Sequence, residues 1–323
     1  MAAIRAATAS ALELPAQLVA VSRSLDVSLF LVLSVLWGLS FPAISVGLDS
    51  LPPLFFAGLR YDVAAILLLA VAAIRIDGWV PTRRDDLAAI AAGGCFLVAG
   101  NGLLFVAQQT VPSGIAAILQ SLAPIVTALL AIVLLDEHLT RVGVVGVAIG
   151  FVGVGLVISP DPGALLAGDT AARLLVVGQV CSIALGGVLV QRFSPAIDRV
   201  ALTGWSMAVG ALVLHAASEV AGEHLVGEGT NPTAVGAVLY LGVFSTAVAF
   251  LIYFAILEKY GAFEVALVSY LVPVVATVAG VFVLGETIGP GAVAGFSLVA
   301  LGFALLKRNA LVDVVDVVAG IRP

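Results

Sequence analysis

Long apolar runs separated by short polar stretches form the main pattern of this chain. Each run holds about 20 residues, the length that an α-helix needs to cross the hydrocarbon core of a bilayer. The polar stretches carry charged residues, Pro and Gly, which end helices and begin turns. The pattern predicts an all-α polytopic membrane protein with ten membrane-spanning helices, over 27–48, 54–74, 87–107, 114–135, 142–159, 174–191, 200–218, 233–256, 263–285 and 290–306.

Composition supports a membrane protein and limits the kinds of molecule that it is expected to bind. Hydrophobic residues make up 62% of the 323 residues and charged residues only 11%, whereas soluble domains have about 25% charged residues. The expected surroundings are therefore a lipid bilayer. The net charge of −6 and the lack of a basic stripe argue against a nucleic-acid partner.

The positions of Lys and Arg predict the orientation of the spans, because basic residues collect on the cytoplasmic side. With a cytoplasmic N-terminus and ten spans, Arg173 alone falls in an outer loop and Arg60 falls inside the second span. The other basic residues all fall inside, at Arg5, Arg23, Arg75, Arg83, Arg84, Arg141, Arg192, Arg199, Lys259, Lys307, Arg308 and Arg322. We expect a multi-pass protein of the plasma membrane with both termini cytoplasmic.

One phrase occurs twice. QSLAPIVTALLAIVLLDE ends at Glu137, and SYLVPVVATVAGVFVLGE ends at Glu286 with the same spacing from Pro to Glu. At that same offset Gly146 matches Gly295, and Gly153 matches Gly302. Such agreement in register indicates an internal duplication. Five spans per copy is an odd number, so the second copy must enter the membrane from the opposite side, as in many secondary transporters.

The sequence resembles the EamA family of the drug/metabolite transporter superfamily over about residues 27–306. LWGLSFPAISVGL resembles the family's opening Trp-Gly-x-x-Phe motif. PPLFFAGLRYDVAAILLL resembles its second span, in which a Pro-containing turn precedes a helix that bears Arg. The second half departs from the pattern, because no Trp-Gly opens its first span. The resemblance implies two inverted five-helix repeats around a central cavity, and the export of amino acids or other small metabolites.

These patterns divide the chain into five parts. The repeats are expected at 27–159 and 174–306, joined by an outer linker at 160–173. A cytoplasmic N-terminal extension at 1–26 and a C-terminal tail at 307–323 complete the chain.

Arg60 is the sharpest candidate for a substrate contact. It lies about two turns into its span, roughly 10 Å deep at 1.5 Å per residue, where a charge is costly. It is either a cavity ligand for a carboxylate or phosphate, or an anchor for a carbonyl or acid on another helix. The remaining candidates for substrate binding are polar or aromatic groups within spans, at Trp37, Asn101, Gln120, Gln179, Tyr253, Ser269 and Tyr270.

Three prolines are expected to bend helices, because Pro removes a backbone hydrogen bond one turn earlier. They are Pro42, Pro124 and Pro273. The carbonyls freed by the last two belong to Gln120 and Ser269, and they need water or another partner in the membrane. We therefore expect these two helices to line a wet cavity.

No set of residues points to catalysis, a metal or a cofactor. His138 lies beside Asp136 and Glu137 but no second histidine is near, and no Walker A sequence occurs. The glycines of the fifth span form one face, which leaves packing within the chain or a homodimer contact as alternatives. The predicted function is a secondary transporter that takes a small-molecule substrate. The alternative is a non-transporting membrane protein, such as an intramembrane enzyme or a channel.

Overall fold

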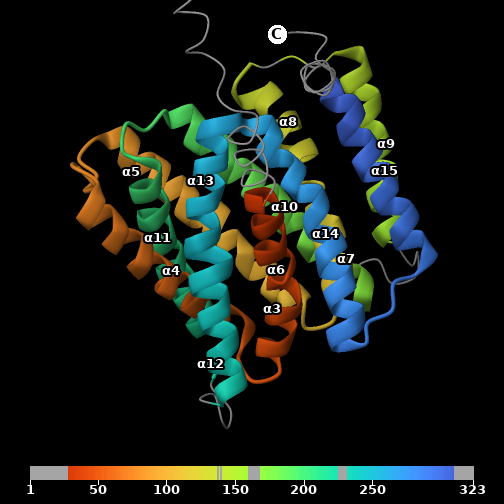
Figure 1. Ribbon diagram of the computed structural model, residues 1–323, viewed down its shortest axis with the longest axis horizontal. Helices are drawn as coiled ribbons and strands as arrows, with labels where there is room; N and C mark the ends of the chain where they lie inside the picture. Colours follow the sequence, from red (N-terminus) through yellow and green to blue (C-terminus); the bar gives the residue numbers. More distant parts are fainter. Residues whose placement is uncertain (1–27, 137, 139, 159–167, 225–230, 309–323) are drawn as a thin grey trace, which may run out of the picture.

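The computed structural model describes residues 28–136, 138, 140–158, 168–224 and 231–308, and these residues form a bundle of helices (Figure 1). Strands are absent from this described part of the chain. The predicted terminal extension at 1–26 lies outside it, as do Glu137 and all but the first two residues of the predicted tail at 307–323.

The first repeat is a series of apolar helices connected by short turns. Its spans are Ser28–Leu48, Pro53–Arg75, Arg84–Ala107, Ser113–Leu134 and Arg141–Ile158. The elements within them are α3 (Ser40–Leu48), α4 (Pro53–Arg75), α5 (Arg84–Ala92), η1 (Gly93–Val98), η2 (Ala99–Asn101), α6 (Gly102–Ala107), α7 (Ser113–Gln120), α8 (Ala123–Leu134) and α9 (Arg141–Ile158).

The second repeat is likewise a series of apolar helices connected by short segments. Its elements are α10 (Gly168–Phe193), α11 (Arg199–Val220), α12 (Pro232–Leu239), η3 (Tyr240–Val248), α13 (Ala249–Tyr260), α14 (Ala262–Leu284) and α15 (Pro290–Leu306). Both η1 and η3 are π-helices, and they occupy the third span of their repeats. A wider helix is rare and often marks a functional segment, so its presence in both copies supports their common origin.

The all-helical membrane fold is confirmed. Nine helices in the described residues are long and apolar enough to cross a membrane. The tenth predicted span, α15, is an apolar helix of 17 residues, just under the length used to define the other nine. The count of ten spans therefore stays a prediction.

Equivalent helices of the two repeats pack against each other in opposite directions. In sequence Gly146 matches Gly295, but in space a Cβ on Gly146 would meet the carbonyl oxygen of Gly302, and one on Gly153 that of Gly295. Figure 1 shows α9 and α15 side by side at one edge of the bundle. The two copies thus run antiparallel, as an inverted repeat requires.

The helix pair α4 and α11 follows the same rule. A Cβ on Gly58 would meet the ring of His215, and one on Gly204 would meet Leu69, so one helix ascends where the other descends. The glycine face of α9 is filled inside the chain, by α15 and by Ile125 against Gly150. The sequence alternative of packing within the chain is the one seen, and the homodimer stays a prediction.

The three prolines lie in differently shaped helices. The first span is interrupted at Leu39, three residues before Pro42. The fourth span is broken between α7 and α8, and Pro124 stands in the first turn of α8. By contrast α14 continues through Pro273. The two equivalent prolines therefore accompany a break in one repeat and an unbroken helix in the other.

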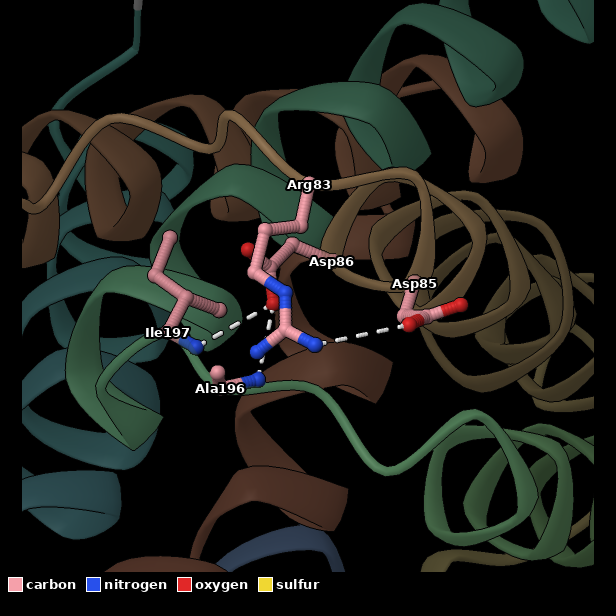
Figure 2. Close-up of polar contacts among 5 residues, drawn as sticks. All are labelled: Arg83, Asp85, Asp86, Ala196 and Ile197. Atoms are coloured by element: carbon pink, nitrogen blue, oxygen red, sulfur yellow. Dashed lines mark hydrogen bonds and ion pairs between the residues drawn. The ribbon is translucent and has the colours of Figure 1, made fainter.

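Acidic side chains near the ends of helices hold the beginnings of helices in the opposite repeat. Asp86 of the first repeat accepts hydrogen bonds from the backbone N–H groups of Ala196 and Ile197, at 2.8 and 3.2 Å, just before α11 begins (Figure 2). Glu223 of the second repeat accepts from those of Leu54 and Phe55 at the start of α4, at 3.1 and 2.9 Å. Because α4 and α11 are equivalent, the two repeats exchange the same kind of contact.

A third carboxylate works in this way at the start of α7. Glu286 accepts from the backbone N–H groups of Ser113 and Gly114, at 2.7 and 3.3 Å, and from the Ser113 hydroxyl at 2.8 Å. Unpaired N–H groups at a helix start need acceptors, and a negative charge suits the positive end of the helix dipole. The repeated Glu is therefore a helix cap in the second copy.

Candidate functional site: a central cavity

A cavity of about 200 Å³ lies between the repeats. Five predicted site residues line it: Trp37, Arg60, Asn101, Gln120 and Ser269. They come from four spans of the first repeat and from α14 of the second. The remainder of the wall is mainly apolar, with Phe41, Leu97, Val98, Leu104, Phe250 and Val272 among its residues.

Arg60 is the charged residue of this wall. Its side chain is 8% exposed, and among the described residues that line the cavity no other is charged. The Nε donates a hydrogen bond of 2.8 Å to the Thr246 hydroxyl on η3 of the second repeat. The guanidinium carbon lies 5.2 Å from the ring centroid of Tyr61. Arg60 thus anchors the two repeats to each other, through a hydroxyl and not the expected carbonyl or acid, and it also lines the cavity, so its role as a substrate ligand stays a prediction.

Three amide side chains form a network beside the cavity. Gln179 donates from its Nε2 to Asn101 Oδ1 and to Gln120 Oε1, both at 3.2 Å. Asn101 Nδ2 donates to the backbone carbonyl of Leu97 at 2.9 Å. Gln179 itself is fully buried and stands behind the wall, so the predicted contact between Gln179 and substrate is not direct in this geometry.

The aromatic candidates divide between the wall and the surrounding packing. Tyr253 packs on Trp37 with ring centroids 5.7 Å apart, and Phe250 packs on Trp37 at 5.9 Å. Tyr270 packs instead on Phe303 of α15 at 4.7 Å. Neither tyrosine is on the cavity wall. Tyr253 supports the wall through Trp37, whereas Tyr270 belongs to the contact between α14 and α15.

A second hollow opens where α3 and α14 end and α7 begins. It is lined in part by Ser45, Asp49, Gln108, Pro112 and Glu286. Gln108 is 5% exposed and its Nε2 donates to the carbonyl of Phe41, at 3.0 Å. Since Phe41 lines the central cavity and Gln108 lines the second hollow, this pair forms part of the partition between them.

Several residues of the site escaped sequence reasoning. Thr246, Tyr61 and Phe41 lie in apolar runs, and nothing in their spacing sets them apart from packing residues. Only their places in the sequence could have suggested a role in the site. Tyr61 directly follows Arg60. Thr246 lies in the third span of its repeat, which is equivalent to the span that holds Asn101. Sequence reasoning also missed the contact between Asp62 and His215, in which Asp62 Oδ2 lies 2.7 Å from His215 Nε2.

Antiparallel helix repeats that enclose a small cavity with one buried guanidinium are the architecture of a secondary membrane transporter. Comparison of sequences agrees with this class. The profile of the EamA-like transporter family matches residues 25–159 and 170–308. The chain belongs to the EamA-like transporter family, and the resemblance seen in its motifs is confirmed.

Three similar proteins are named as transporters or as an efflux pump. The chain is 30% identical to an uncharacterized transporter of Archaeoglobus fulgidus, over 84% of this chain and 95% of the relative. It is 33% identical to an uncharacterized inner membrane transporter of Escherichia coli strain K12, YedA, over 79% and 82%. It is 29% identical to a Salmonella typhimurium protein named "Probable amino-acid metabolite efflux pump", over 86% and 93%.

A solved structure shares the fold. It superposes with a TM-score of 0.62 at 20% identity and covers 88% of this chain and 98% of its own. Together these comparisons place the chain among multi-pass membrane transporters.

Proposed function

We propose that this protein exports amino acids or other small metabolites across the plasma membrane, with both termini in the cytoplasm. The central cavity is the substrate site, and it opens to either side in turn as the repeats move against each other. The observation that carries the proposal is the cavity itself: it lies between antiparallel repeats and holds Arg60 at its wall.

The antiparallel repeats support alternating access. Each repeat supplies helices to the cavity, and each holds the other by a carboxylate at a helix start. Each of these contacts joins one carboxylate to two backbone N–H groups, so breaking it would not require the helices to repack. A rocking motion of one repeat against the other would then expose the same site to the two sides.

Export in particular is supported by the relative that is named an efflux pump. The buried wall of the cavity suits a small solute, since pockets with a few polar groups among apolar ones fix the orientation of such ligands.

The test is transport by the purified chain in proteoliposomes, with amino acids, nucleosides and organic anions supplied in separate reactions. We expect saturable movement of at least one class. Arg60→Ala should reduce it by about tenfold or more, since hydrogen bonds to charged groups contribute about 1.5–3 kcal/mol and about 1.4 kcal/mol corresponds to tenfold.

The matched control is Arg75→Ala. Arg75 is the last residue of the same helix, α4, and its side chain is exposed. Both variants should insert into vesicles like the wild type. Transport that Arg60→Ala leaves unchanged would argue against the cavity as the substrate site.

A further inference from the structure

We infer that the central cavity selects a compact apolar solute bearing one anionic group, and that Gln179 sets this preference from behind the wall. The inference rests on the proposed function and adds the class of substrate. It follows from the direction of the hydrogen bonds around the cavity.

The backbone carbonyl of Leu97 fixes which way the hydrogen bonds of the amide network run. Its carbonyl oxygen accepts from Asn101 Nδ2 at 2.9 Å. A carbonyl oxygen cannot donate, so the amide of Asn101 must present its nitrogen there. Its Oδ1 is therefore turned toward Gln179.

The orientation of the Asn101 amide fixes the orientations of the next two amides in the network. Gln179 must present its Nε2 to Asn101 Oδ1, and the same nitrogen donates to Gln120 Oε1. Gln120 consequently uses its oxygen in the network. The group that Gln120 has left for a ligand in the cavity is its NH₂, a donor.

Arg60 supplies further donors to the cavity. The Nε of Arg60 is bound to Thr246, which leaves the two terminal nitrogens of the guanidinium as positively charged donors. The hydroxyls of Ser40 and Ser121 already donate to the carbonyls of Trp37 and Ile118, each at 2.6 Å, so they offer a ligand only acceptor lone pairs, and the preference for an anion rests on Arg60 and Gln120.

Donors and one positive charge are what a carboxylate or phosphonate binds. An ammonium group, by contrast, would face Arg60 without an acidic residue among the described residues of the wall. Buried like charges repel strongly because the surroundings screen them poorly. The cavity should therefore bind organic anions and reject solutes with an ammonium group, so among the small metabolites of the proposed function it favours acids without an amino group.

The size of the cavity limits the rest of the solute. An apolar cavity of about 150 Å³ holds a benzene ring, and this one measures about 200 Å³. One ring or one branched chain beside the acid group fills it, and Trp37, Phe41 and Phe250 supply the apolar contacts. Benzoate, benzamide and benzylamine are matched probes, since they share the ring and differ in charge.

The experiment measures binding of these three probes to the full chain in lipid nanodiscs, by calorimetry. We expect benzoate to bind at least about tenfold more tightly than benzamide, and benzylamine not to bind measurably. Arg60→Met should abolish the difference between benzoate and benzamide, and Arg60→Lys should retain part of it. Equal affinity of the wild type for the three probes would overturn the inference.

Gln179→Met tests the positioning role. Without the Gln179 amide the side chain of Gln120 can turn its oxygen toward the ligand, so benzoate affinity should fall about three- to tenfold while benzamide affinity is kept. Damage to the cavity would weaken both probes equally. Gln191→Met is the control, because Gln191 lies exposed on the same helix, α10.

Gln120→Met removes the donor directly and should reproduce this change of ratio even where Gln179→Met does not fold. A benzoate-to-benzamide ratio that Gln120→Met leaves unchanged would overturn the role of the network.

Transport in vesicles separates this inference from the proposed function. Export of an uncharged or cationic solute that depends on Arg60, with no binding of benzoate, would leave the transporter in place and reject the anion site. Selective binding of benzoate without movement of any solute in the vesicle screen would support the site and reject export.

Discussion

Gly153 and Gly295 lie backbone to backbone where α9 crosses α15. A Cβ on Gly153 would come within 2.6 Å of the carbonyl oxygen of Gly295, and a Cβ on Gly295 within 2.5 Å of that of Gly153. The equivalent pair in the duplication is Gly302 and Gly146, where each added Cβ would come within 2.4 Å of the other residue's carbonyl oxygen, as expected for equivalent helices related by a two-fold axis in the membrane plane. Membrane helices associate largely through such close packing, because lipid supplies little hydrophobic drive between them.

Gly153→Ala should therefore destabilise the fold. The added methyl group meets backbone, which cannot move aside as a flexible side chain can, and overpacking costs about 1–3 kcal/mol. We expect the midpoint temperature of thermal unfolding in detergent to fall by several degrees. Gly155→Ala is the control on the same helix: nothing lies within 4 Å of its Cβ, so it should leave the midpoint unchanged or raise it. Equal effects of the two variants would contradict this packing.

Thr246→Val should lower the affinity of the cavity for benzoate without abolishing binding. The substitution keeps the shape of the side chain and removes the acceptor of Arg60 Nε. Hydrogen bonds to charged groups contribute about 1.5–3 kcal/mol, so we expect about a tenfold loss in the affinity for benzoate. Thr246→Ser keeps the hydroxyl and should retain most of the affinity. An affinity for benzoate that Thr246→Val leaves unchanged would contradict the role of this hydroxyl.

Asp86→Ala should loosen the turn that leads into α11. The variant leaves the N–H groups of Ala196 and Ile197 without their acceptor (Figure 2), and hydrogen bonds to charged groups contribute about 1.5–3 kcal/mol. We expect faster hydrogen exchange at these two amides and a lower unfolding temperature. The neighbouring Asp85 is 59% exposed and only meets Arg83 at 3.8 Å, so Asp85→Ala should change neither, because such surface pairs contribute little. Unchanged exchange in Asp86→Ala would contradict the capping role.

Gln108→Ala should open the partition between the cavity and the second hollow. The bond from Gln108 to the carbonyl of Phe41 is lost, and so is the volume of the side chain. A suitable reporter is Ser40→Cys, placed on the cavity wall in a protein without its two exposed cysteines, Cys95 and Cys181. We expect a membrane-impermeant maleimide to label it several-fold faster in the Gln108→Ala protein.

Gln109→Ala is the matched control for that experiment, since Gln109 is exposed and its side chain donates to the carbonyl of Val106 in the preceding helix, α6. Labelling of the reporter at the same rate in both variants would show that Gln108 does not close the path.

Sequence predicted the helices and their order well, because apolar runs of membrane length leave few alternatives. The expected span 54–74 is found at Pro53–Arg75, and 200–218 at Arg199–Val220. Opposite orientation of the repeats also followed from counting, and the packing of α9 on α15 agrees with it. The duplicated phrase gave the positions of equivalent residues without any structure.

The site was harder to predict, because its chemistry depends on contacts between distant segments. Sequence could single out Gln179 as a buried amide, but not show that it stands behind Asn101 and Gln120. Tyr270 had the same polar character as the cavity residues, yet it faces Phe303. Thr246 is one of several hydroxyls within spans, and sequence could not single it out because its role depends on a side chain from the other repeat. Hydropathy along the chain does not show which side chains of the two repeats contact each other in the folded protein.

The duplicated phrase takes two shapes within one molecule. Around Pro124 the helix is interrupted, and around Pro273 it runs on. Equivalent sequences that adopt both shapes in one fold show that either is compatible with this kind of packing. If the two repeats exchanged these conformations, the result would be related to the present structure by a half-turn about an axis in the membrane plane. In the proposed alternating access, the state that opens to the other side would then need no conformation that the chain does not already show.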